Sequence, residues 1–288
     1  MRGDSVDRLA AELGVPADQV RTARTPRGGV LFGFRCEPGA CLEVWRLARE
    51  RFGSTGLWPF ITHTPPTEWE WADEAGDNRD EGRRQPIVDR LIDLQVNDLL
   101  TEAQWFRGPQ VNSTPARDLE DLARRLADAT PAAGTRAPRS AQSLLATCFA
   151  EPPEWICLVS TEDPSGLPEL LDAPFTPNHT PFPGGEELSY QDHASVLRAW
   201  HDRYGAEICC LDTHEVMLSV EHPPAAPLET ARVAIEHYAY CPDLDQVIGG
   251  LPEVALQVPT RTGSSGGTEE PSAYRSTGSM GRTGLRSG

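Results

Sequence analysis

Apolar residues recur along the chain with two different spacings, and these spacings predict where helices and strands lie. Helical spacing occurs at 5–13, 41–52, 87–100, 119–126, 141–149, 189–204 and 228–238. Short apolar or alternating runs typical of strands occur at 30–34, 57–61, 155–159, 206–211 and 216–220. Helices interspersed with short strands predict an α+β or α/β protein, in which a mixed sheet is flanked by helices.

Individual residues at the ends of these runs sharpen the prediction. Ser189 and Asp192 have the spacing of a capping box at the start of a helix, and Gly205 follows as its stop. Gly53 is expected to end the 41–52 helix. Pro59 lies inside a predicted strand and cannot donate a main-chain hydrogen bond, so that strand is expected at a sheet edge or a bulge.

Changes in composition divide the chain into four parts. Residues 1–162 form an N-terminal α/β region, and residues 62–85 within it are an acidic, Trp-rich insertion. A Pro, Gly and Asn-rich linker is expected at 163–185, followed by a C-terminal module at 186–260. The tail at 261–288 has almost nothing to bury, so we expect it to be disordered.

The insertion carries two tryptophans, Trp69 and Trp71, among acidic residues. Large aromatic side chains in a polar loop either anchor a partner or pack back on the protein's own core. The second alternative is the more common fate of tryptophan.

Composition and charge exclude several kinds of chemistry. The 288 residues include no lysine, which removes Schiff-base and lysine-base catalysis and the lysine-bearing phosphate loop. A net charge of −17 disfavours nucleic acid and anionic membranes as partners. No apolar run is long enough to span a bilayer, and residues 1–20 contain no apolar core of the signal-peptide type. We therefore expect a cytoplasmic protein with reduced cysteines.

The acidic charge is concentrated near the C-terminal module. Residues 186–245 hold twelve acidic side chains and three arginines. A basic protein partner would be steered toward such a region. The same charge also serves simply to keep a protein in solution.

The C-terminal module has the most specific pattern in the chain. Its distinctive segments are Val196–Trp200, Arg203–Glu207, Pro223–Pro224 and Tyr240–Asp243. In this order they resemble the bacterial family catalogued as domain of unknown function 4253. The resemblance implies one folded module, and it implies no activity, cofactor or catalytic residue.

The same segments supply the candidate functional residues, which are Arg203, Tyr204, Glu207, Tyr240, Cys241 and Asp243. Cys241 is the best candidate nucleophile, but its reactivity depends on its helix. If Cys241 closes the preceding helix, the helix dipole disfavours its thiolate; if Pro242 opens a new helix, Cys241 becomes an N-cap and the thiolate is favoured. His237 could serve as its base only in the first arrangement.

No metal site and no cofactor is predicted, because no pair of His or Cys residues in the module has zinc-ligand spacing. The chain is therefore expected to be a non-catalytic interaction or ligand-binding protein, with an acidic neutraliser of a basic partner as one version. The alternative is a small hydrolase or thiol enzyme centred on Cys241 and Asp243. A cleft at these two residues would favour the enzyme, and a flat acidic face would favour the binder.

Overall fold

The protein is described by a computed structural model. The described residues are 2–37, 39–69, 87–102, 115–130, 153–173, 188–212, 215–241, 250–258 and 272–275. The predicted helix at 141–149, Trp71, Pro242 and Asp243 lie outside them.

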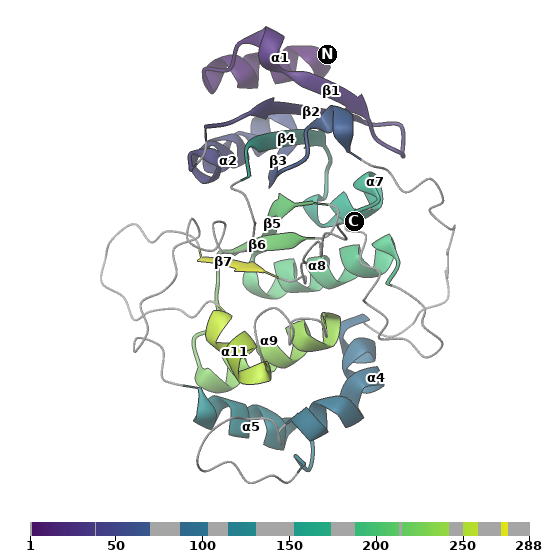
Figure 1. The fold of residues 1–288 in the computed structure, drawn as a ribbon, viewed down its shortest axis with the longest axis vertical. Helices are drawn as coiled ribbons and strands as arrows, with labels where there is room; N and C mark the ends of the chain where they lie inside the picture. Colours follow the sequence, from purple (N-terminus) through teal and green to yellow (C-terminus); the bar gives the residue numbers. More distant parts are fainter. Residues whose placement is uncertain are drawn as a thin grey trace, which may run out of the picture.

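One mixed sheet runs through the molecule and draws strands from both halves of the chain (Figure 1). Its order is β1-β2-β4-β3-β5-β6-β7. The strands are β1 (Arg21–Arg24), β2 (Val30–Arg35), β3 (Leu57–Thr62), β4 (Trp155–Ser160), β5 (Ala206–Leu211), β6 (Val216–Val220) and β7 (Ser272–Arg275). Only β3 and β5 pair in parallel among these strands. The predicted α+β class is confirmed.

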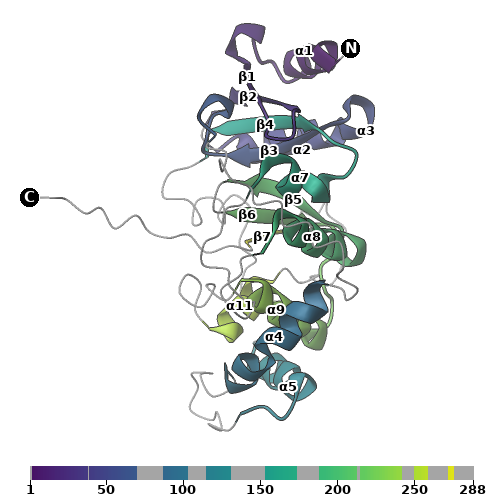
Figure 2. The ribbon, with the colours of Figure 1, turned by 90° about the vertical axis from the view of Figure 1, so that its right-hand side faces the viewer.

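The helices lie beside the sheet and beyond its β7 end. They are α1 (Arg2–Glu12), α2 (Cys41–Glu50), α3 (Phe52–Thr55), α4 (Ile87–Glu102), α5 (Leu119–Ala129), α7 (Leu167–Leu171), α8 (Tyr190–Tyr204), α9 (Pro227–Tyr240) and α11 (Leu251–Gln257). Three short 3-10 turns are η1 (Ala17–Gln19), η2 (Pro66–Glu68) and η3 (Pro164–Gly166). Figure 2 shows α4, α5, α9 and α11 grouped at one end, and α1 at the other. None of the described helices is long and apolar enough to cross a membrane.

The predicted edge position of β3 is wrong. This strand lies between β4 and β5, and all six of its residues are buried. Pro59 is tolerated there because β3 pairs with β5 at Ile61, opposite Cys210, so this ladder requires no N–H at position 59. The carbonyl of Pro59 instead accepts a hydrogen bond from the indole Nε1 of Trp45 at 2.9 Å. A side-chain donor thus replaces part of a strand ladder, and sequence spacing does not reveal this.

Helix ends agree with the prediction in one half of the chain and depart from it in the other. The capping box of Ser189 and Asp192 and the left-handed stop at Gly205 (φ 59°) are confirmed for α8. The first helix begins at Arg2 rather than at residue 5. Gly53 does not end its helical segment, because α3 continues the chain in helical form up to Gly56, which takes the left-handed conformation (φ 65°).

The segments predicted as a linker and as a disordered tail each include a few residues with secondary structure. In the expected linker, η3 and α7 bury Leu167 and Leu171 completely. In the expected disordered tail, β7 pairs antiparallel with β6, with Tyr274 opposite Leu218. The other residues of the tail lie outside the described part. The division of the chain into domains stays a prediction.

Trp69 packs on the protein's own core. Its side chain is buried, and its ring meets that of Phe60 edge to face, with centroids 5.8 Å apart. Of the two alternatives for this tryptophan, packing against the core is the one observed.

Candidate functional site

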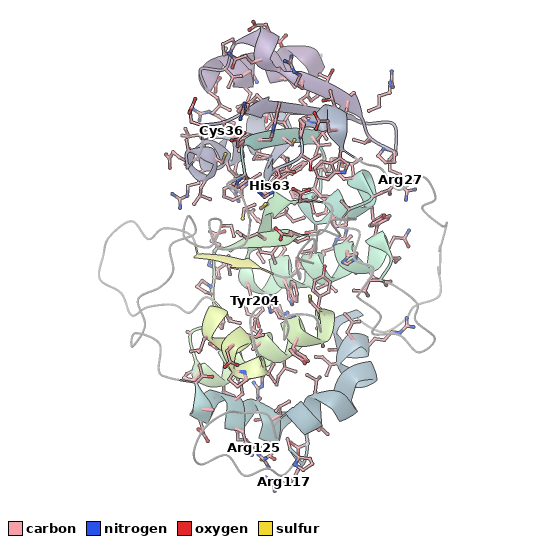
Figure 3. All side chains as sticks on the ribbon, in the orientation of Figure 1. Arg27, Cys36, His63, Arg117, Arg125 and Tyr204 are labelled. Carbon is pink, nitrogen blue, oxygen red and sulfur yellow. The ribbon has the colours of Figure 1, made fainter. Side chains whose placement is uncertain are left out.

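An apolar pocket lies between the sheet and helices α8 and α9. It comprises about 310 Å³ of space, part of it open to solvent. The lining residues come from α8, β5, β6, α9 and two connecting segments: Trp200, Tyr204, Ala206, Leu218, Val220, Pro224, Val233, His237 and Val258. Figure 3 shows Tyr204 at the level where the sheet gives way to the lower helices. The pocket can therefore accept an apolar group, with one hydroxyl and one imidazole in its wall.

The aromatic wall of the pocket is held rigidly. The indole of Trp200 stacks on the imidazole of His237, with ring centroids 4.1 Å apart and planes 16° from parallel. Trp200 Nε1 donates to Glu236 Oε2 at 3.1 Å, which fixes the indole in its plane. Trp200 is only 1% exposed, as expected for a core anchor of α8. The wall thus keeps its shape without a ligand.

His237 is held in its neutral form. Burial lowers its pKa to about 3. Its Nδ1 lies 2.8 Å from the carbonyl of Val233, so Nδ1 carries the proton and donates it to that oxygen. At neutral pH the pocket therefore contains no imidazolium charge.

Of the predicted residues, Tyr204 lines this pocket, and Arg203 lies beside it in contact with the Tyr204 ring. The guanidinium of Arg203 forms a bidentate pair with Glu236, at 2.7 and 2.6 Å, and lies 5.2 Å from the ring centre of Tyr204. Burial raises the pKa of Tyr204 above its ordinary value. Since Glu236 also accepts from Trp200, one carboxylate orders both the arginine and the aromatic wall.

Tyr240 and Cys241 lie behind this wall. The hydroxyl of Tyr240 is 2.6 Å from Nδ1 of His193, and its ring meets Trp200 edge to face at 5.3 Å. Burial raises the pKa of Tyr240. The N–H of Cys241 donates to the carbonyl of His237 at 2.9 Å, so Cys241 closes α9, and it is completely buried.

Glu207 points elsewhere. Its carboxylate forms a bidentate pair with Arg49 of α2, at 2.9 and 2.6 Å. Because adjacent side chains of a strand alternate between faces, Glu207 and its neighbour Ala206, which lines the pocket, project in opposite directions. Asp243 lies outside the described residues. The structure therefore brings Arg203, Tyr204 and Tyr240 toward one place and separates Glu207 from them.

Comparison with protein families agrees with the resemblance seen in the C-terminal segments. A family model described as "Domain of unknown function (DUF4253)" matches residues 156–261. These residues form a DUF4253 module. The match begins with β4, so the module includes α7 as well as the 186–260 segment predicted for it. No curated protein and no solved structure gives a significant match.

A second polar cluster joins the DUF4253 module to the N-terminal region. Asp212, directly after β5, accepts from the N–H of His63 at 3.0 Å, the hydroxyl of Thr62 at 3.2 Å and the hydroxyl of Thr64 at 3.2 Å. Nδ1 of His63 also lies 3.3 Å from the same carboxylate. Asp212 is buried, whereas His63 is partly exposed.

This cluster was not predicted from the sequence. The signal was present, since a polar residue directly follows each of two buried strands, β3 and β5. In parallel strands these carboxyl ends meet at one edge of the sheet, where functional side chains often lie. The pairing of β3 with β5 was the missing information. A fixed carboxylate that orients an imidazole can hold the imidazole in one tautomer.

The described residues contain no group of three His, Cys, Asp or Glu side chains placed to hold a metal ion. The polar atoms around the pocket are instead engaged by one another, as for Arg203 with Glu236 and Tyr240 with His193.

Proposed function

We propose that the DUF4253 module is a non-catalytic binding module for a small apolar ligand, which occupies the pocket between α8, α9 and the sheet. The observation that carries this proposal is the lining of that pocket: Trp200, Leu218, Val220 and Val233 present apolar surface on several sides. Preformed, mostly apolar concavities are the usual form of small-molecule sites. No charged side chain lines the pocket.

Size and shape limit the ligand. The space of about 310 Å³ includes solvent at the mouth of the pocket, so the enclosed part admits only a small group. The apolar lining favours a compact apolar group, such as a single ring or a branched hydrocarbon. Tyr204 offers the hydroxyl that could meet a single polar group of the ligand.

The acidic residues of this module argue against an acidic docking face. Several of them form contacts within the protein. Asp192 caps α8, Asp212 binds the segment after β3, Glu207 pairs with Arg49, and Glu236 pairs with Arg203. A neutraliser of a basic partner would need such carboxylates free on one face. The enzyme alternative lacks an equivalent support, because Cys241 does not line the pocket.

The proposal is tested by ligand titration of the full chain. Indole and toluene serve as apolar probes, and glucose serves as the polar control. Binding to the folded state alone raises the thermal midpoint as ligand concentration increases. We expect the two aromatic probes to raise it and glucose to leave it unchanged, with calorimetric titration confirming one site.

A filled pocket provides the matched variant. Val220→Phe adds a ring at the pocket wall, whereas Leu47→Phe adds the same ring at a residue that is 45% exposed on α2. The first variant should lose the response to indole and the second should keep it. Equal responses from Val220→Phe and the unchanged protein would place any binding outside this pocket and refute the proposal.

A further inference from the structure

Two cysteines meet at the turn between β2 and α2, outside the DUF4253 module. Cys36 directly follows β2, and Cys41 is the first residue of α2. The N–H of Cys36 donates to the carbonyl of Glu154 at 2.6 Å, and Sγ of Cys41 donates to the carbonyl of Pro153 at 3.1 Å. Both cysteines are thus attached to consecutive carbonyls of one segment, which brings them to the same place.

The turn itself keeps them together. The N–H of Ala40 donates to the carbonyl of Glu37 at 2.9 Å, and Gly39 adopts the left-handed conformation (φ 85°) that reverses the chain. Figure 3 shows Cys36 beside α2. Two cysteines five positions apart therefore face each other across a short closed turn rather than along an extended strand.

The two thiols differ in their chemistry. Side-chain hydrogen bonding with Cys41 lowers the pKa of Cys36, while the same interaction and burial raise the pKa of Cys41. Cys36 is also the most exposed of the six described cysteines, at 7%. Cys36 is thus the less buried thiol and the more inclined to ionise, and its neighbour Cys41 stays protonated. Such a pair matches an attacking cysteine, here Cys36, and a resolving cysteine, here Cys41.

We propose that Cys36 and Cys41 form a thiol-oxidation site, which a small two-electron oxidant, such as a peroxide, converts to an intramolecular disulfide. The Cys36 thiolate attacks the O–O bond of the peroxide, forms a sulfenic acid and releases the other oxygen as water or an alcohol. The Cys41 thiol then attacks this sulfur and expels water as the S–S bond forms. Two thiols lose two electrons and two protons, and the peroxide is reduced.

A low-molecular-weight disulfide gives the same product by exchange. The Cys36 thiolate displaces one thiol from the reagent and forms a mixed disulfide, which Cys41 then resolves by releasing the second thiol. The product would join the end of β2 covalently to the start of α2. Helix α2 carries Trp45 and Arg49, which bond to β3 and β5. Oxidation would therefore act on the N-terminal side of the sheet and not in the apolar pocket.

The test uses the full folded chain and mass spectrometry. Protein is treated in parallel with hydrogen peroxide or oxidised glutathione, denatured in an alkylating reagent, and cut with trypsin. Cleavage after Arg35 and Arg46 places both cysteines in one peptide, 36–46. We expect most of this peptide to be unalkylated and two hydrogen masses lighter. The 204–232 peptide, with buried Cys209 and Cys210, should remain fully alkylated and serves as the internal control.

Two variants separate the roles. In Cys41→Ser, we expect Cys36 to accumulate as a sulfenic acid with peroxide, trapped by dimedone, or as a glutathione adduct with oxidised glutathione. In Cys36→Ser, Cys41 should stay an alkylatable thiol. Melting curves of both variants establish that they fold. Disulfide formation in the wild-type protein tests the proposal independently of either variant. Recovery of the wild-type 36–46 peptide with both thiols alkylated, or with Cys36 oxidised and Cys41 free, would overturn the proposal.

Discussion

The imidazole of His237 stacks on the indole of Trp200, with ring centroids 4.1 Å apart and planes only 16° from parallel. A charged imidazolium at this position would lose its hydration in an apolar wall, and burial accordingly lowers the pKa of His237 to about 3. In the unfolded chain the same side chain regains an ordinary pKa near 6.5. This difference makes the stability of the folded chain depend on pH.

The first prediction concerns acid sensitivity. Because the unfolded chain binds the proton and the folded chain does not, the stability from a neutral His237 is present above pH 6.5 and is lost as pH falls toward 3. Between pH 7.5 and pH 5 the protonation of His237 in the unfolded chain should lower the free energy of unfolding by about 2 kcal/mol. His237→Phe removes this titration, so the free energy of unfolding of wild type minus that of the variant should fall by the same amount. Urea unfolding at the two pH values measures it, and an unchanged gap would contradict the prediction.

A second prediction addresses the indole itself. Trp200→Ala leaves a cavity in the wall and breaks the hydrogen bond to Glu236, so unfolding free energy should fall by roughly 3 to 5 kcal/mol. Denaturant unfolding gives the value. Leu47→Ala, at an exposed site, is the control and should be close to neutral. A neutral effect of Trp200→Ala would mean that the indole is not a core anchor.

Sequence periodicity predicted the elements that depend on local signals. The capping box and Gly205 placed α8 correctly, because both act within one turn of the helix. Apolar runs likewise identified β4 and β5. What periodicity could not supply was strand neighbours. Pro59 predicted an edge strand because it has no N–H to donate. The contact of its carbonyl with Trp45, fourteen positions away along the chain, is not visible in the sequence.

The same limit applies to the candidate sites. Arg203 and Tyr204 are adjacent in sequence, so their contact beside the pocket required no tertiary information. Glu207 lies only three residues beyond Tyr204, yet strand alternation turns it to the other face, toward Arg49. The contact between His63 and Asp212 joins residues 149 positions apart. Such a contact is set by the parallel pairing of β3 with β5, which no local pattern encodes.

A third prediction tests the cluster around Asp212 as a clamp between the two halves of the sheet. Asp212→Ala would leave the N–H of His63 and the hydroxyls of Thr62 and Thr64 without their acceptor, at a cost on the order of 3 kcal/mol. Asp202→Ala, at an exposed residue of α8, should change little. Chemical denaturation of both variants distinguishes them, and equal stabilities would show that the clamp contributes nothing.

The fourth prediction concerns the tail. Four residues of β7 form hydrogen bonds worth about 0.5–1.5 kcal/mol each, while ordering each residue costs about 1–2 kcal/mol. These contributions nearly cancel, so deletion of residues 261–288 should leave the thermal midpoint almost unchanged. Calorimetry on the full and shortened chains provides the comparison. A clear fall in the midpoint would show that β7 stabilises the sheet beyond its own hydrogen bonds.

The last prediction separates a structural role for Cys241 from a catalytic one. Cys241 is fully buried and its N–H is bonded to the end of α9, so its thiol should be inaccessible to alkylating reagents in the folded protein. Trypsin places it in the peptide 233–261, apart from the other cysteines. After brief alkylation at neutral pH, Cys36 should carry more label than Cys241, and denaturation should remove the difference. Preferential labelling of native Cys241 would favour the thiol-enzyme alternative. A buried thiol at the C-terminal end of a helix is not expected to react, so such labelling would require an open site around Cys241.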